Sequence, residues 1–205
     1  MVSQKVGRVR DKRKTRVMRA SPWPALFRLA VTQDGLISAR QADELGCSQQ
    51  QLGKYVNSGK LERVQRALYR IVDFPPGKHD DLMAVWLWSR TEGVVSYETA
   101  LFLHDLSNVL PSKADITVPL DWKKRTVLVP KGVVLHYGNI PTDDRGWIGA
   151  LPVTTVRRTL LDCLHGTLSP ELVAQAFQQA AARGLIHIEE SVTAANVNSW
   201  RQKTA

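Results

Sequence analysis

The sequence predicts an α+β fold, and two sets of observations lead to this prediction. Between residues 35 and 71, two short helices with clear start signals are followed by two β-prone runs rich in arginine. From residue 80 onward, segments with helical spacing alternate with short runs of β-branched residues. The first pattern is the order of a winged helix-turn-helix, so we expect such a unit at the N-terminus, followed by a mixed α+β C-terminal domain.

Both short helices begin with a capping box. Ser38 stands three residues before Gln41, and Ser48 stands three residues before Gln51. At this spacing the serine hydroxyl accepts a free amide of the first turn, while the glutamine side chain reaches back to the serine amide. The two helix starts are therefore marked by local sequence alone.

The first helix is predicted over residues 39–45, with Ala42 and Leu45 on its buried side. Gly46 supplies the left-handed backbone that ends this helix and opens a tight turn. The second helix then follows over residues 49–57. The pair has the lengths and the short connection of a helix-turn-helix.

The second helix has one apolar and one polar face. Leu52 and Val56 lie on the inner side, and the polar face, spaced at i, i+3, i+4 and i+7, carries Gln50, Gly53, Lys54 and Asn57. Amide side chains match adenine in the major groove, and a glycine lets the backbone come close. We predict that this face, together with Gln49, reads DNA. The alternative is an ordinary solvated helix surface.

A hairpin is predicted after the second helix, with a turn at residues 64–66. Arginines on a wing commonly contact phosphates or the minor groove. The residues expected on or beside the tip are Arg63, Gln65, Arg66 and Arg70. The alternative is a hairpin whose charges only aid solubility.

Most of the net charge of +9 lies in the first 19 residues. Eight cations and one anion, Asp11, give this segment a charge of +7, so the rest carries only +2. With few apolar residues, the segment is expected to be a disordered arm that gains DNA affinity by displacing counterions. The alternative is a tail that aids solubility. The expected DNA contacts are Arg8, Arg10, Lys12, Arg13, Lys14 and Arg16.

A chain of 205 residues with 43% hydrophobic residues can bury a core and fits two small domains. Paired prolines and a glycine in DFPPGKH break any periodic element and predict a linker. The expected division is a basic arm at 1–21, a winged helix-turn-helix at 22–72, a linker at 73–79, an α+β domain at 80–190 and a tail at 191–205.

In the second half we expect both helices and strands. Ser96 is expected to cap a short helix, and Thr154 or Thr155 another. Further helices are predicted over residues 80–89 and from Ser169 to Gly184, and strands over residues 116–118, 126–129, 133–137 and 151–153.

Several function classes are disfavoured. The longest apolar run, residues 82–88, falls far short of the roughly 20 residues that span a membrane, and no secretory signal is seen. Cys47 and Cys163 indicate neither a disulfide framework nor a zinc site, so a reducing, cytoplasmic compartment is expected. No cofactor or metal site is predicted.

An enzymatic function is also disfavoured. The sequence has neither a phosphate-binding loop nor a nucleophile elbow. Asp162 lies four residues after Arg158, a spacing that predicts a structural ion pair on one helix face. Asp80 and Asp81 are expected to stabilise a helix start.

These motifs resemble a known family. The run from residue 35 to 71, ending in ALYRI, resembles the N-terminal winged helix of AbiEi-type antitoxins. SYETALFLHDLSN from Ser96 and LPVTTVRRTLLDCL from Leu151 look like downstream segments of the same family, so the resemblance covers most of residues 22–185. Two features depart from it: Ala67 stands where a glycine is expected, and a fused nuclease module is expected to be absent.

The resemblance implies a DNA-binding antitoxin and transcriptional autorepressor of a type IV toxin-antitoxin operon. Its implied partners are double-stranded DNA with inverted repeats at its own promoter and a nucleotidyltransferase-like toxin, contacted directly or indirectly. By position, the resemblance reaches no catalytic residue and extends to Gln49, Gln50, Lys54, Arg63 and Arg66. Two alternatives are a protein-interaction module whose winged helix is a scaffold and a stand-alone transcriptional regulator without a toxin.

Overall fold

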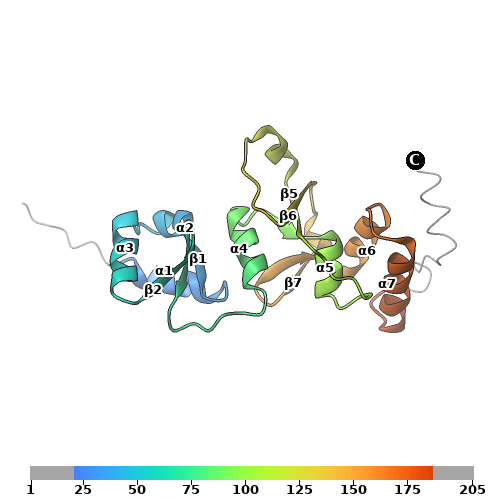
Figure 1. Cartoon of the computed structure of the whole chain (residues 1–205), viewed down its shortest axis with the longest axis horizontal. Coiled ribbons are helices and arrows are strands. Elements are labelled where there is room, and N and C mark those ends of the chain that lie inside the picture. Colours follow the sequence, from blue (N-terminus) through green and yellow to red (C-terminus); the bar gives the residue numbers. More distant parts are fainter. Residues whose placement is uncertain (1–20, 187–205) are drawn as a thin grey trace, which may run out of the picture.

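The structure, a computed structural model, describes residues 21–186 and confirms the α+β class. Figure 1 shows an elongated arrangement, with a small sheet and helices α1 to α3 at one end, a larger sheet in the middle, and helices α6 and α7 at the other end. The predicted basic arm and the C-terminal tail lie outside the described residues, apart from Ser21.

The N-terminal part is a helix-turn-helix packed on a three-stranded antiparallel sheet. Its elements are α1 (Trp23–Val31), β1 (Leu36–Ser38), α2 (Ala39–Glu44), α3 (Gln49–Asn57), β2 (Leu61–Gln65) and β3 (Leu68–Ile71). The strand order is β1-β3-β2, so β2 and β3 form the hairpin of the wing. Both capping boxes are present, and the predicted bounds of α3 are confirmed.

The turn of the wing lies later than predicted. β2 continues through Val64 to Gln65, with an irregular register after Arg63, so only Arg66 and Ala67 connect the strands. Ala67 has a φ of 60°, the left-handed conformation that a glycine adopts without strain. The prediction of a turn at residues 64–66 is wrong because β2 gains partners in β3 as far as Gln65.

The second half contains a five-stranded mixed sheet of order β6-β5-β4-β8-β7. The pairs β4–β8 and β5–β6 are parallel, and the remaining neighbours are antiparallel. The strands are β4 (Val94–Val95), β5 (Ala114–Val118), β6 (Val133–Tyr137), β7 (Arg145–Ile148) and β8 (Leu151–Thr154). The helices are α4 (Asp80–Trp88), α5 (Tyr97–Leu103), η1 (Leu120–Lys124), η2 (Thr142–Asp144), α6 (Val156–Leu164) and α7 (Pro170–Ala182).

Two predictions for this half are wrong in detail. Residues 126–129 do not form a strand, because this segment projects from the sheet and its Leu128 is 92% exposed, without a buried face. Ser96 precedes α5, but its buried hydroxyl lies 2.7 Å from that of Thr117 and does not cap the helix. Both errors concern contacts with strands distant in sequence: within residues 21–186 no strand pairs with residues 126–129, and the Ser96 hydroxyl contacts Thr117 of β5.

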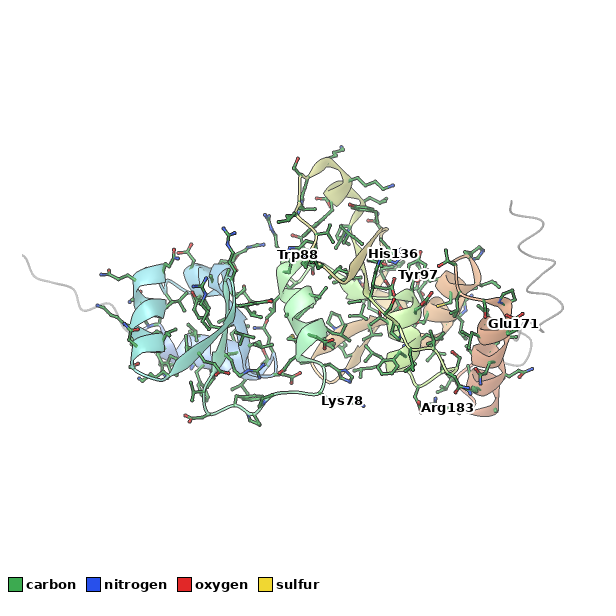
Figure 2. The ribbon with its side chains drawn as sticks, viewed as in Figure 1. Lys78, Trp88, Tyr97, His136, Glu171 and Arg183 are labelled. Atoms are coloured by element: carbon green, nitrogen blue, oxygen red, sulfur yellow. The ribbon has the colours of Figure 1, made fainter. Side chains whose placement is uncertain are left out.

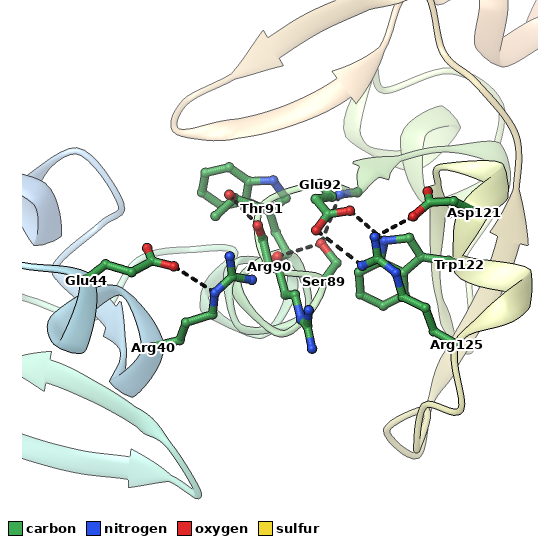
Figure 3. A network of polar contacts seen from close by, with 11 residues as sticks. Arg40, Glu44, Ser89, Arg90, Thr91, Glu92, Asp121, Trp122 and Arg125 are labelled. Atoms are coloured by element: carbon green, nitrogen blue, oxygen red, sulfur yellow. Dashed lines mark hydrogen bonds and ion pairs between the residues drawn. The ribbon is translucent and has the colours of Figure 1, made fainter. Parts of the chain in front are cut away.

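The connection from β5 to β6 is braced at its base against the end of α4. The indole Nε1 of Trp122 donates to Glu92 at 2.7 Å, and Arg125 pairs with both Glu92 and Asp121 (Figure 3). Burial raises the pKa of Glu92, but the hydrogen bonds from Trp122 and Arg125 outweigh this effect and lower it overall. The base of this projection is therefore held by an ion-pair network.

The small sheet shares a core with the second half. Leu36 and Leu68 pack in one buried cluster with Leu82 and Met83 of α4. Burying a large aliphatic side chain contributes roughly 1.5–3 kcal/mol. The winged helix is therefore docked onto α4 by apolar packing, not attached through the chain connection alone.

Arg70 is not at the wing tip, and that prediction is wrong. It is 4% exposed, its Nη2 donates to Asp80 at 2.6 Å, and its Nε lies 3.5 Å from Glu62. Successive side chains of a strand alternate between faces, and β3 is the central strand of its sheet. Arg70 consequently joins β3 to the first turn of α4 and does not face solvent.

The starts of the last two helices, α6 and α7, agree with the prediction. Thr155 and Ser169 cap α6 and α7, and Gly184, with a φ of 66°, follows the end of α7. Each helix within residues 21–186 is too short or too polar to serve as a membrane span. Cys47 and Cys163 are both free and buried.

Candidate nucleic-acid interface

Helix α3 turns its polar face to solvent. Leu52 on the opposite face is 1% exposed and Val56 is half-buried. Within residues 21–186 the amide side chains on the polar face make no hydrogen bond, so their donors and acceptors are available to a ligand. The exposed residues of this face are Gln49, Gln50, Gly53, Lys54 and Asn57.

The first turn of α3 is held by its capping box. Ser48 Oγ accepts the amide of Gln51 at 3.3 Å, and Gln51 Oε1 accepts the amide of Ser48 at 2.9 Å. Gly46, with a φ of 77°, makes the tight turn after α2, and Cys47 is fully buried beneath it. The polar side chains that follow are thus carried on a pre-ordered helix, which lowers the entropy lost on binding.

Gly53 lies in the middle of this exposed face. A Cβ added there would meet nothing within 4 Å, so packing within the protein does not require a glycine. A glycine inside a helix costs roughly 1 kcal/mol relative to alanine. The position is therefore unfavourable for the helix, and it matches what a close approach of another molecule to the backbone would require.

The wing continues the surface of α3. The amide of Lys60 donates to the carbonyl of Tyr55 at 2.9 Å, so β2 leaves directly from the end of the helix. The wing residues predicted to contact DNA are all exposed: Arg63, Gln65 and Arg66. Arg63 Nε also donates to the carbonyl of Gln65 at 3.4 Å, which holds its guanidinium at the end of the hairpin.

The predicted arm contacts lie outside the described residues, and these are Arg8, Arg10, Lys12, Arg13, Lys14 and Arg16. Their positive charge is a property of the sequence. Of the predicted DNA contacts, the structure describes those of α3 and of the wing, which lie exposed on two consecutive elements, α3 and the β2–β3 hairpin.

A second group of polar residues lines a cavity of about 480 Å³ in the C-terminal half. His136 Nε2 lies 2.8 Å from Asp115 Oδ1, and the rings of His136 and Tyr97 stack with centroids 3.8 Å apart (Figure 2). Tyr97 has a φ of 49°, unusual for a bulky side chain. The sequence alone did not reveal this group because its members come from three separate elements, α5, β5 and β6, and its only signal was the polar residues within the two strands.

The chemistry of this cavity does not indicate an activated nucleophile. Cys163 lines it, but burial and the nearby Asp162 raise the pKa of its thiol, opposite to the shift that a reactive thiolate needs. Burial and Asp115 also raise the pKa of Glu98. Within residues 21–186, no group of three or more His, Cys, Asp or Glu side chains is placed to hold a metal ion.

Asp162 forms the ion pair predicted for it. Arg158 Nε donates to Asp162 at 2.8 Å, one helical turn apart, and Arg158 Nη1 donates to Asp144 at 3.1 Å. Burial raises the pKa of Asp162, although Arg158 opposes this shift. The pair ties α6 to η2, which is a structural role.

An exposed polar helix beside an exposed basic hairpin is the arrangement of a winged helix-turn-helix. Residues 24–72 match the family described as "Transcriptional regulator, AbiEi antitoxin". This match covers the winged helix alone and spans less than half of the 205 residues. The role described for this family is that of an antitoxin and transcriptional regulator.

The other comparisons are weaker. No curated protein matches the chain. Among solved structures, the crystal structure of the RV2827C protein from Mycobacterium tuberculosis covers 88% of this chain and 81% of its own, at 12% identity and a TM-score of 0.40. At that score the likeness does not establish a shared fold.

Proposed function

We propose that this protein is a DNA-binding antitoxin and the transcriptional autorepressor of a type IV toxin-antitoxin operon. The observation that carries the proposal is the exposed polar face of α3 beside Arg63 and Arg66 of the wing, within the segment that matches the antitoxin family. The proposed ligand is double-stranded DNA with inverted repeats upstream of its own gene. The proposed setting is the cytoplasm.

The proposal divides the work between two parts of the chain. Residues 22–72 bind the operator, with Gln49, Gln50 and Asn57 facing base edges in the major groove. Lys54 and the wing arginines contact phosphates, which positions the helix without reading sequence. Residues 80–190 support neutralisation of a nucleotidyltransferase-like toxin, through direct contact or indirectly.

Fluorescence anisotropy tests the DNA-binding part of the proposal. A labelled duplex from upstream of the gene is compared with a scrambled duplex over a range of salt concentrations. Gln50→Ala should weaken binding to the operator about tenfold, within the usual 1–3 kcal/mol of a base contact, and should leave the scrambled duplex unaffected. Lys54→Ala should weaken both and reduce the salt slope by roughly 0.9.

Lys78→Ala is the matched control, because it removes the same charge from an exposed residue beside α4, away from α3 (Figure 2). It should bind like the unaltered protein. Absence of salt-sensitive binding, or equal effects of Lys54→Ala and Lys78→Ala, would contradict the proposed interface. Growth rescue on co-expression with the neighbouring toxin separates an antitoxin from a stand-alone regulator.

A further inference from the structure

The first described residues of the chain lie against the recognition helix. Ser21 Oγ is 3.2 Å from the hydroxyl of Tyr55 on α3, and the amide of Trp23 donates to Ser21 Oγ at 3.3 Å. The rings of Trp23 and Tyr55 have centroids 4.9 Å apart. The start of α1 is thus fixed to the side of α3 by one ring contact and one hydrogen bond, and the second hydrogen bond holds Ser21 against the first turn of α1.

A cation completes this cluster. Lys60 Nζ lies 5.1 Å from the ring centroid of Trp23 and 5.9 Å from that of Tyr55, within the range of a cation–π interaction. Lys60 immediately precedes β2, so the cluster joins the start of α1, the side of α3 and the base of the wing. We call Ser21, Trp23, Tyr55 and Lys60 the arm root.

The arm root adjoins the proposed DNA-binding face. Tyr55 follows Lys54, which is on the exposed face of α3. Residues 1–19 carry a charge of +7, and Arg19 is only two residues before Ser21. A fully extended chain covers about 3.3 Å per residue, so 20 residues can reach roughly 65 Å, several times the width of a DNA groove.

We propose that the arm root positions residues 1–20, fixing where this segment begins so that its cations bind phosphates of the duplex that α3 reads. This inference rests on the proposed DNA-binding function. Fixing one end of a charged segment next to the bound duplex raises its effective concentration there. Ser21, Trp23 and Tyr55 are positioning residues, because they act through the arm.

The alternative is that the ring cluster only seals the edge of the apolar core, since Trp23 and Tyr55 also pack against it. The two roles differ in one measurable respect. A residue that acts through the arm loses its influence on DNA binding when the arm carries no charge. A residue that only supports the fold keeps the same influence.

The experiment is a double-mutant cycle in the full-length chain. In the arm-neutral variant, the eight Lys and Arg residues between positions 5 and 19 are changed to Gln. It is combined with Tyr55→Leu, and all four proteins are titrated against a random duplex and the upstream duplex at several salt concentrations. Because each lost phosphate contact reduces the salt slope by about 0.9, the arm-neutral variant should lose roughly 3–6 units of slope.

Tyr55→Leu should weaken binding about three- to tenfold in the unaltered chain and less than about twofold in the arm-neutral chain. Tyr55→Phe keeps the ring contact and loses only the hydrogen bond to Ser21, so it should restore part of the affinity and leave a smaller loss. Ser21→Ala removes the other end of the same hydrogen bond at an exposed residue, and it tests the root if Tyr55→Leu does not fold.

Three outcomes bear on the inference differently. If Tyr55→Leu weakens DNA binding equally in the unaltered and the arm-neutral chain, the positioning role is overturned while DNA binding itself stands. The same holds for Ser21→Ala where it replaces that variant. An unchanged salt slope in the arm-neutral variant would overturn the contact between arm and DNA. Failure of the unaltered chain to bind either duplex would overturn the proposed function itself, and with it this inference.

Discussion

Replacing Gly53 by alanine separates the stability of α3 from its proposed contact with DNA. The added Cβ meets no atom within 4 Å, and Gly53 is exposed within a helix. No favourable packing is lost or gained, so the effect on folding is that of helix propensity. We expect the free energy of unfolding to rise by about 1 kcal/mol, which raises Tm by roughly 2–4 °C in a chain of this size.

The same methyl group is expected to weaken DNA binding. If the backbone at Gly53 comes within van der Waals distance of the groove floor or a phosphate, the Cβ forces α3 outward and lengthens the neighbouring hydrogen bonds of Gln50 and Asn57. A loss of about 1.4 kcal/mol corresponds to tenfold weaker binding. The variant should therefore be more stable and yet bind DNA less tightly.

Thermal unfolding followed by circular dichroism and anisotropy titration of the same preparation give the two quantities. Gly53→Gln should weaken binding further because its side chain is longer. Gly53→Ala with higher Tm and unchanged affinity would refute the reasoning that the backbone approaches DNA at this position. A fall in Tm would refute the helix-propensity argument instead.

Three further outcomes are expected. Asp80→Ala should lower the free energy of unfolding, measured in urea titrations, by about 3 kcal/mol, because it leaves the buried guanidinium of Arg70 with only the more distant Glu62. A change below about 0.5 kcal/mol would contradict this. Ala67→Gly should raise it by up to about 1 kcal/mol, since glycine relieves the left-handed strain of the wing turn, and a decrease would show that no strain is stored there. Burial lowers the pKa of His104 from its usual 6.5, so the stability present above pH 6.5 is lost as the pH falls through the lowered value. His104→Gln should flatten this loss in urea titrations between about pH 5 and 7. An unchanged dependence of the unfolding free energy on pH would contradict this expectation.

The helix-turn-helix could be predicted because its determinants are local. Ser38 and Ser48 bond within three residues along the chain, and both capping boxes are present in the structure. The spacing of Leu52 and Val56 predicts which side of α3 is buried, because residues three and four apart lie on the same face of a helix. The exposed face of α3 follows from the same spacing.

The residues that were placed wrongly depend on partners far along the chain. Arg70 was expected at the wing tip, but its role was decided by Asp80 and by the central position of β3. Residues 126–129 have strand-like composition, yet they have no neighbouring strand within residues 21–186. The group of Tyr97, Asp115 and His136 was not predicted because α5, β5 and β6 bring it together only in the folded chain.

The amino-acid sequence by itself determined the short capped helices, the polar face of α3 and the concentration of positive charge before residue 20. Only the tertiary structure decided which arginines of the wing are exposed, where the hairpin turns and how the start of α1 meets α3. The physical reason is the range of the interactions. Caps and helical faces are set by hydrogen bonds and spacings of three to four residues, whereas burial and ion pairing depend on chain segments that meet only after folding.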